Sequence, residues 1–172
     1  LSIQVGTAAS VLGLPFAVAL GWWLARTRSR LRTVVSTVVF LPLVLPPVVT
    51  GWLLVALLGR NAPIGHALAT LGLPVPFTPT AAVIAAWVVG LPLYVMSARA
   101  AFEAVDRRYE ELSQSLGTPP WETFRRVTLP LAAPGLAGGA VLAFARGLGE
   151  FGATIVLAGN TDATRTIAVA VY

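Results

Sequence analysis

The chain has 172 residues, of which 56% are hydrophobic and only 11% are charged, and its mean hydropathy is +0.80. Soluble domains average roughly 45–50% apolar and about 25% charged residues, so this composition excludes an ordinary water-soluble domain. The net charge of +5 comes entirely from arginines that flank long apolar runs, which argues for a membrane surface and against nucleic acid, and the lack of cysteine excludes disulfides and thiolate metal sites.

Four apolar segments are each long enough to cross a bilayer, which takes about 20 residues. A backbone in lipid must satisfy its own hydrogen bonds, and these runs lack the alternation of barrel strands, so we expect helices. Prolines must bend or break the second segment. The sequence therefore predicts an all-α, polytopic membrane protein. The four segments are 3–25, 33–58, 80–98 and 131–159.

Arginine is distributed unequally between the connecting segments. Nine arginines lie in the connections 26–32 and 99–126, whereas the linker 59–79 holds only Arg60. By the positive-inside rule, the first two connections are cytoplasmic, and the first span runs from outside to inside. The chain then ends on the outer side, where Arg165 lies. Because it starts without Met and stops within an apolar run, we expect a fragment.

The outer linker contains few candidate functional residues. Ile64, Leu68 and Leu71 have the spacing of a short interfacial helix, and an irregular loop fits the same residues equally well. The only histidine, His66, has no second ligand at metal-binding spacing, so we expect no metal site.

The segment 99–126 is far more polar than the rest of the chain, with ten charged side chains in 28 residues. Tyr109, Leu112 and Leu116 form a narrow apolar stripe on a first helix. Gly117 then tolerates the left-handed backbone that ends such a helix.

A second helix follows directly. Thr118 can cap it and Pro119 suits its first turn, while Trp121, Phe124 and Val127 mark an apolar face and Pro130 opens the next span. The sequence thus predicts a cytoplasmic helix–turn–helix hairpin. Its apolar residues suit docking into a groove of another protein, and an amphipathic loop resting on lipid headgroups explains them equally well.

The spacing within this hairpin resembles a motif of permease subunits of ATP-binding-cassette importers, E-A-A-x-x-x-G, then nine residues, then I-x-L-P. The Glu, Gly, Leu and Pro match, while Leu112 and Ser113 replace two alanines and Val127 replaces isoleucine. The resemblance implies a coupling segment, 101–130, that fits a cleft of a separate ATPase subunit. Its candidate coupling residues are Glu111, Leu112, Ser113, Leu116, Gly117, Val127, Leu129 and Pro130.

Three further stretches resemble the molybdate permease family: FLPLVLPPVVTGWLL (40–54), LAFARGLGEFGATIVLAGN (142–160) and TRTIAVAVY (164–172). Sulfate and thiosulfate permeases share the A-R-x-[LIM]-G-E-[FY]-G core, and the double proline and TRTI favour molybdate or tungstate. The resemblance implies one MetI-like (type I) permease domain over 1–172, in the cell's plasma membrane. It also implies that a short N-terminal piece and at least one C-terminal helix of that domain lie outside this sequence. It also implies a homodimer with the path between subunits, a periplasmic or extracellular oxyanion-binding protein, and ATP and Mg²⁺ held by the ATPase.

Arg146 and Glu150 are the two charges of the fourth segment. A lone charge in hydrocarbon costs roughly 2.5–3.5 kcal/mol by insertion scales, and at the spacing i, i+4 the two side chains share one helix face and can neutralise each other. Either this is a structural ion pair, or it lines or gates the translocation path. The prolines of the second segment likewise break a helix beside that path or simply kink it. The candidate path or gate residues are Arg146, Gly149, Glu150, Phe151, Gly152, Pro46 and Pro47.

Small residues recur every four positions in the same segment. Gly135 and Gly139 form a GxxxG pair, and Ala145, Gly149 and Ala153 continue the spacing. Such faces let helices approach closely in lipid, either within the chain or between subunits.

Catalysis is not expected in this chain. It contains no lysine and therefore no phosphate-binding G-x-x-x-x-G-K-[ST] motif, and none of its spans contains a histidine that could activate a serine. ATP hydrolysis must then belong to a partner. Two alternatives to a molybdate importer remain open: a sulfate or thiosulfate permease of the same architecture, and a membrane scaffold that recruits a cytoplasmic protein without transport.

Overall fold

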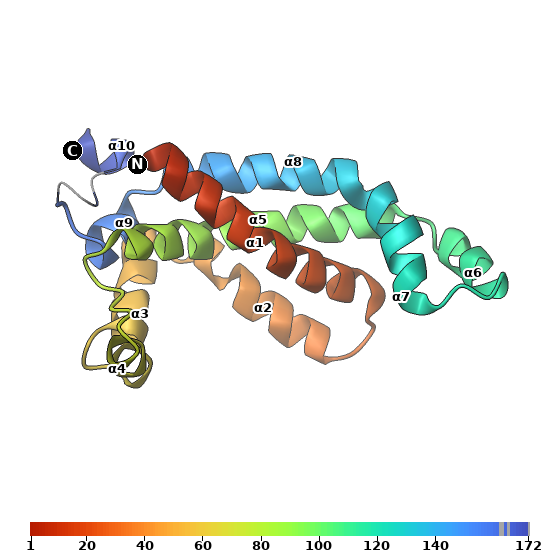
Figure 1. The fold of residues 1–172 in the computed structure, drawn as a ribbon, viewed down its shortest axis with the longest axis horizontal. Coiled ribbons are helices and arrows are strands. Elements are labelled where there is room, and N and C mark those ends of the chain that lie inside the picture. Colours follow the sequence, from red (N-terminus) through yellow and green to blue (C-terminus); the bar gives the residue numbers. More distant parts are fainter. Residues whose placement is uncertain (162–163, 165, 172) are drawn as a thin grey trace.

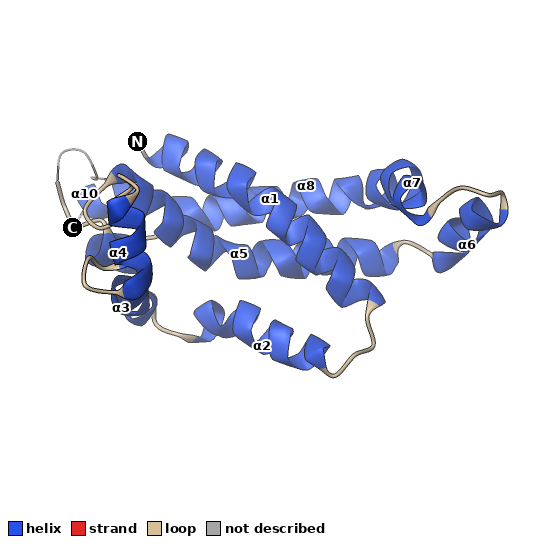
Figure 2. Cartoon of the chain, turned by 60° about the horizontal axis from the view of Figure 1, so that its bottom comes forward, coloured by secondary structure: helices blue, strands red, loops and turns tan. Residues whose placement is uncertain are grey.

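The computed structural model describes residues 1–161, 164 and 166–171, and these residues form helices joined by loops, with no strand among them (Figures 1 and 2). Three long helices lie side by side as a bundle: α1 (Ser2–Arg26), α5 (Pro79–Ala104) and α8 (Leu129–Leu148). The all-α prediction is confirmed. The shorter elements are α2 (Leu31–Val44), α3 (Pro47–Leu58), α4 (Pro63–Thr70), α6 (Arg107–Ser115), α7 (Pro120–Thr123), the π-helical turn η1 (Phe124–Thr128), α9 (Gly152–Leu157) and α10 (Ile167–Ala170).

The bundle is held by small residues that let the helix backbones approach. A Cβ atom on Gly21 of α1 would lie 2.6 Å from Ala98 Cβ of α5, and one on Gly139 would lie 2.8 Å from Ser97 Cβ. Gly135 of α8 meets Ala101 of α5 in the same way. The GxxxG pair therefore packs within the chain, as lipid-embedded helices without a hydrophobic drive between them require.

This packing predicts opposite effects for one substitution at two glycines of α8. In Gly135→Ala, the new methyl would lie 2.5 Å from Ala101 Cβ, whereas in Gly138→Ala it meets nothing within 4 Å. Overpacking typically costs about 1–3 kcal/mol, while alanine in an open helical position gains roughly 0.5–1 kcal/mol over glycine. Thermal unfolding in detergent should therefore show a lower midpoint for Gly135→Ala only. Equal midpoints for the two variants would contradict the α5–α8 packing.

The second predicted span is broken, as its prolines require. Helices α2 and α3 meet at a bend of 119° around Leu45 and Pro46, so three helices are long and apolar enough to span a membrane, or four if this bent pair counts as one span. Helix α2 has no fully buried residue and lies at the edge of the bundle, where Val35, Val39 and Phe40 pack against its core half-buried.

The fourth predicted segment is not a single helix. Helix α8 ends at Leu148, Gly149 is its C-terminal cap, and α9 begins at Gly152. Helix α9 packs against α3: a Cβ atom on Gly51 would lie 2.9 Å from Ala153 Cα. The hydropathy of the sequence does not reveal this break, because the segments on both sides of it are equally apolar.

The two ends of the molecule carry different elements (Figure 1). The N-terminus and α10 lie at one end, with α3, α4 and α9, while α6 and α7 lie at the other. The linker 59–79 contains a short helix, α4, and Leu71 follows it as the cap, so a helix forms there and not an irregular loop, while its position at a membrane interface stays a prediction. The predicted outer position of Arg165 lies outside the described residues.

The polar hairpin forms with two changes from the prediction, of which the first concerns the start of its second helix. Gly117 has a φ of +86° and closes the turn after α6, as expected. Thr118 does not cap the second helix. Its backbone N–H donates to Ser113 O at 3.2 Å, and Pro119 takes the capping position instead. The second helix therefore starts one residue later than predicted.

Pro130 does not open a separate helix either. Elements α7, η1 and α8 form one continuous helix of 29 residues, Pro120–Leu148. In a regular α-helix the Pro130 ring would clash with the carbonyl of Arg126. The π-helical turn ends just before this proline and widens the backbone there, which lets the hairpin continue directly into the span.

Candidate functional site

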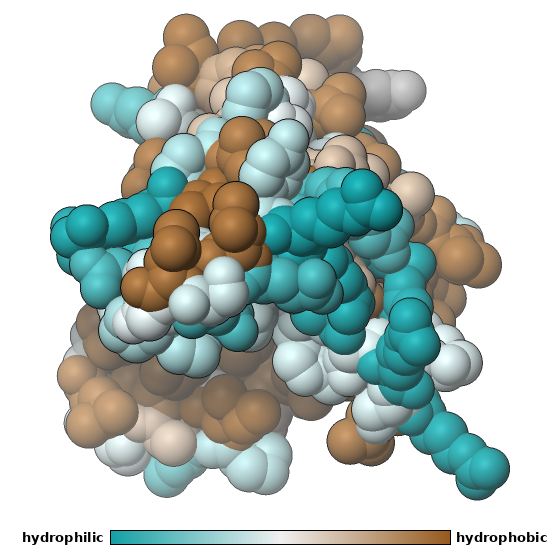
Figure 3. Space-filling model, turned by 90° about the vertical axis from the view of Figure 1, so that its right-hand side faces the viewer, coloured by the Kyte–Doolittle hydropathy of each residue, from teal (hydrophilic) through white to brown (hydrophobic). Residues whose placement is uncertain are grey.

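The hairpin presents large apolar side chains to solvent at the arginine-rich end of the molecule. Tyr109, Leu112, Leu116 and Trp121 are 56%, 61%, 79% and 70% exposed. Figure 3 views this end and shows apolar atoms standing among strongly hydrophilic ones. Exposed apolar residues at a turn between two helices, surrounded by charge, are suited to insertion into a groove of a partner protein.

The residues of the motif divide into exposed and inward-facing ones. Glu111 lies on the exposed face with Leu112 and Leu116, whereas Val127 and Leu129 are half-buried. Ser113, which stands where the motif has alanine, hydrogen-bonds through its Oγ to Thr123 Oγ1 at 3.0 Å and joins α6 to α7. The departure from the motif therefore has a structural role in this hairpin.

Aromatic rings fix the second half of the hairpin to the bundle. Trp121 stacks on Phe124 with ring centroids 5.6 Å apart. Phe124 in turn contacts Trp22 of α1 edge to face at 5.4 Å and Phe102 of α5 at 6.2 Å. The exposed indole is thus the outer member of an aromatic cluster that reaches into the helices.

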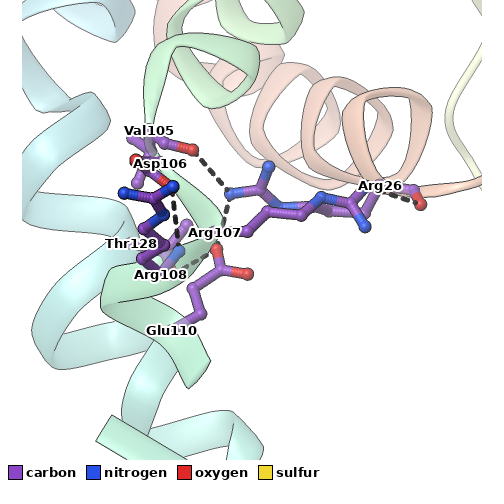
Figure 4. A network of polar contacts seen from close by, with 7 residues as sticks. All are labelled: Arg26, Val105, Asp106, Arg107, Arg108, Glu110 and Thr128. Carbon is purple, nitrogen blue, oxygen red and sulfur yellow. Dashed lines mark hydrogen bonds and ion pairs between the residues drawn. The ribbon is translucent and has the colours of Figure 1, made fainter. Parts of the chain in front are cut away.

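A polar network behind the hairpin was not found by sequence reasoning (Figure 4). Arg26, at the end of α1, donates to Glu110 Oε1 of α6 at 2.6 Å, and Thr128 of η1 donates to the same oxygen at 2.8 Å. The partners are far apart in sequence, so no local spacing reveals them. The one available signal was the concentration of charge in both arginine-rich connections, which this contact brings to the same end.

Glu150 lies at the junction of α8 and α9 and is almost completely buried, with 2% exposure. Its Oε2 pairs with Arg146 Nη1 at 2.7 Å, and its Oε1 accepts the backbone N–H of Ala153 at 2.7 Å. The predicted ion pair is therefore present. The expectation that both residues share one helix is wrong, because α8 has ended at Leu148. The N-cap residue of α9 is Phe151, which makes no side-chain capping bond, and the side chain of the preceding Glu150 supplies the cap by accepting the Ala153 N–H.

The other candidate gate residues also lie at or beside this junction. Pro46 caps α3, and a Cβ atom on Gly152 would lie 2.8 Å from Pro47 Cβ, so the starts of α3 and α9 are in contact. Phe151 is the residue before α9. Gly149 has only the carbonyls of its own helix near it, so it does not continue the packing face predicted from the four-residue spacing.

A groove of about 1020 Å³ opens at the end of the molecule that carries α3, α4 and α9. It runs between α3, the following loop and the end of α9, with Trp52, Arg60, Asn61 and Phe77 among the residues that line it. Phe77 has a φ of +62°, a strained backbone for an aromatic residue. The groove offers apolar surface with a cationic edge.

Comparison with known proteins gives the family. The model of the binding-protein-dependent transport system inner membrane component matches residues 17–172. The chain is 42% identical to the molybdenum transport system permease protein ModB of Azotobacter vinelandii and 44% identical to that of Escherichia coli (strain K12), each over 100% of this chain and 77% and 76% of the relative. It is 38% identical to the putative molybdenum transport system permease protein YvgM of Bacillus subtilis (strain 168), over 100% of this chain and 77% of that protein.

These matches agree with the fold and with the apolar helices, because this family has the MetI-like fold and is located in the inner membrane as multi-pass proteins. The resemblance predicted from the hairpin motif is confirmed at the level of the family. The chain belongs to the inner membrane components of binding-protein-dependent transport systems.

Proposed function

We propose that this chain is the permease subunit of an ATP-driven importer that moves molybdate into the cytoplasm. The observation that carries the proposal is the exposed apolar surface of the hairpin, Tyr109, Leu112, Leu116 and Trp121, placed at the arginine-rich end and continuous with a membrane-spanning helix. A permease that hydrolyses nothing itself needs such a contact to receive motion from an ATPase. The relatives named above are molybdenum transport permeases, which supports the choice of cargo.

The coupling segment, 101–130, would dock into a separate ATPase subunit that binds ATP and Mg²⁺. Leu112 and Leu116 would enter the groove of that subunit, and Glu111 would face its surface, while Gly117 sets the turn between the two arms. Closure of the ATPases would then move the hairpin and switch the permease between outward-open and inward-open states as rigid bodies. We infer a homodimer of this chain, with the path between the two copies and lipid around them.

The junction of α8 and α9 would form part of the path. A free glutamate would repel a dianionic oxyanion, and a free arginine would hold it too tightly. In the pair, Arg146 and Glu150 neutralise each other and permit passage. An external binding protein would deliver the anion to the outer end of the permease. The groove beside Trp52 and Arg60 offers this binding protein a docking surface.

Uptake of labelled molybdate tests the proposal. Cells should carry the full-length gene with its neighbouring genes, with excess sulfate as competitor. We expect saturable uptake that resists sulfate and is lost with the ATPase gene. Uptake abolished by sulfate would keep the importer and change its cargo to sulfate or thiosulfate. Absence of uptake of either anion, with the protein present in the membrane, would favour a scaffold that only recruits a cytoplasmic protein.

A further inference from the structure

One carboxylate oxygen joins the ends of three elements behind the hairpin (Figure 4). Glu110 Oε1 accepts from Arg26 Nη2 of α1 at 2.6 Å and from Thr128 Oγ1 of η1 at 2.8 Å. Arg26 Nη2 also lies 3.4 Å from Val105 O, at the end of α5. Through Glu110 the first arm of the hairpin thus contacts the end of α1 and the turn that leads into α8, and through Arg26 it is linked to the end of α5.

A second contact runs in the opposite direction. Arg107 Nη2, one turn before Glu110 on α6, donates to the backbone carbonyl of Arg26 at 3.3 Å. The end of α1 therefore both donates to α6 and accepts from it. Two contacts of opposite sense limit rotation of α6 about the end of α1 as well as its separation from α1.

The network is shielded from water, unlike the other ion pairs of this end. The side chains of Arg26 and Glu110 are 14% and 19% exposed, whereas those of Arg126 and Glu122 are 74% and 37% exposed. Exposed pairs contribute little to holding a geometry, because solvent screens them and both side chains remain mobile. A short, charge-assisted contact in a partly buried site holds its geometry more firmly.

Glu110 and its neighbour Glu111 consequently differ in role. Glu111 is exposed and makes up part of the surface that a partner would meet, while Glu110 points back toward the bundle. A docked ATPase would push on the exposed side of α6. The network would carry this push to α1 directly and to α8 through Thr128 and η1.

We propose that Glu110 is a positioning residue that fixes the coupling hairpin to α1 and to the start of the α8 span, so that displacement of the hairpin moves both helices together. The inference rests on the proposed function, since it takes the hairpin as the place where an ATPase acts. It adds a residue outside the motif and an element, α1, that the motif does not include.

The first test compares transport with ATP hydrolysis in the reconstituted complex of the full-length permease and its ATPase. Glu110→Gln keeps the volume and an acceptor for Thr128 but removes the charge. We expect the ATPase to co-purify with the variant and to hydrolyse ATP as it does with the wild type. The amount of molybdate carried per ATP should fall by about tenfold, which is the change in an equilibrium constant that the loss of one charge-assisted contact produces. An unchanged ratio would overturn the proposal.

Arg32→Gln is the matched control. Arg32 pairs with Glu103 at 3.0 Å at the same end of the molecule, so this variant also removes one charged contact, but Arg32 lies on α2, outside the coupling segment. We expect its transport ratio to equal that of the wild type. If the transport ratio fell equally in both variants, the effect would be a general one and the proposal would be overturned. If uptake by Glu110→Gln fell only as much as the amount of that protein, the effect would be merely structural, which would overturn the proposal as well.

A second measurement tests the connection without transport or ATPase. The chain has no cysteine, so Ala19→Cys on α1 and Ser115→Cys on α6 allow spin labels to be attached at two exposed positions. In lipid nanodiscs with excess unlabelled protein, we expect a narrow distance distribution that broadens in Glu110→Gln. The charge-reversed pair Arg26→Glu with Glu110→Arg should narrow it again.

Identical distributions in the wild type and Glu110→Gln would overturn the connection. A broadened variant together with a wild-type complex that binds no ATPase would reject the proposed function alone, because the spin-label result does not depend on a partner. The two failures are therefore distinguishable.

Discussion

Glu150→Ala is expected to lower oxyanion uptake by at least about tenfold while most of the protein still inserts into the membrane. The carboxylate is buried and both its oxygens are engaged, by Arg146 and by the Ala153 N–H. Removing one partner of a buried pair costs about 3–5 kcal/mol, and losing a helix cap costs roughly 0.5–2 kcal/mol more. This cost falls on the junction of α8 and α9, whereas membrane insertion depends on the apolar helices. Uptake should be measured against the amount of permease in the membrane fraction.

The double variant Arg146→Met with Glu150→Gln separates the two interpretations of this pair. It removes both charges and keeps an acceptor for the Ala153 N–H. If the pair only orients the helices, uptake should return to near the wild-type rate. If it gates the path, uptake should stay low. Normal uptake by a well-expressed Glu150→Ala protein would reject the gate.

Gly117→Val should uncouple ATP hydrolysis from uptake. The residue has a φ of +86°, and a Cβ atom there would meet nothing within 4 Å, so the whole cost comes from the backbone. A left-handed conformation costs a residue with a Cβ about 1–2 kcal/mol, and a β-branched side chain is the least tolerant of it. We expect the turn to open, which moves Leu116 away from the docking surface and lowers uptake by about tenfold. The ratio of uptake to ATP hydrolysis in the reconstituted complex is the measurement.

Two variants control for strain and for side-chain bulk. Gly117→Asn keeps the turn, because asparagine tolerates the left-handed region, and should retain coupling. Gly72→Val introduces the same strain at a φ of +76°, in the outer linker and again in open space, and should leave ATPase binding unchanged. Full coupling in Gly117→Val would count against the role of this turn.

The sequence was sufficient wherever a feature depends on neighbouring residues. Apolar runs predicted the helices of the bundle, the prolines around Pro46 predicted the bend, and Gly117 predicted the turn. The spacing of Arg146 and Glu150 predicted their contact, although the reason given for it, a shared helix, was wrong. The backbone continues to turn after α8, with the Glu150 N–H donating to Gly147 O at 3.3 Å, so Glu150 still comes to lie beside Arg146.

The sequence was insufficient where distant segments decide the structure. The break before α9 depends on the contact of Gly152 with Pro47 and on the cap that Glu150 provides, and neither leaves a trace in local hydropathy. The network around Glu110 joins residues 84 positions apart. Either Pro119 or Pro120 could stand at the first position of the second helix, so the sequence alone did not determine at which of them that helix begins. The role of the site residues in transport remains a prediction.

The helix from Pro120 to Leu148 turns between α7 and α8 (Figure 1), so that the hairpin meets α8 at an angle without a break in the chain of helical residues. Helix α8 has 20 residues and measures about 30 Å, at 1.5 Å per residue. A tilt of about 5° at its hairpin end would then displace its other end by roughly 3 Å. That far end leads into the junction that holds Glu150. A cytoplasmic motion too small to reshape any helix is thus geometrically sufficient to open or close an outer passage.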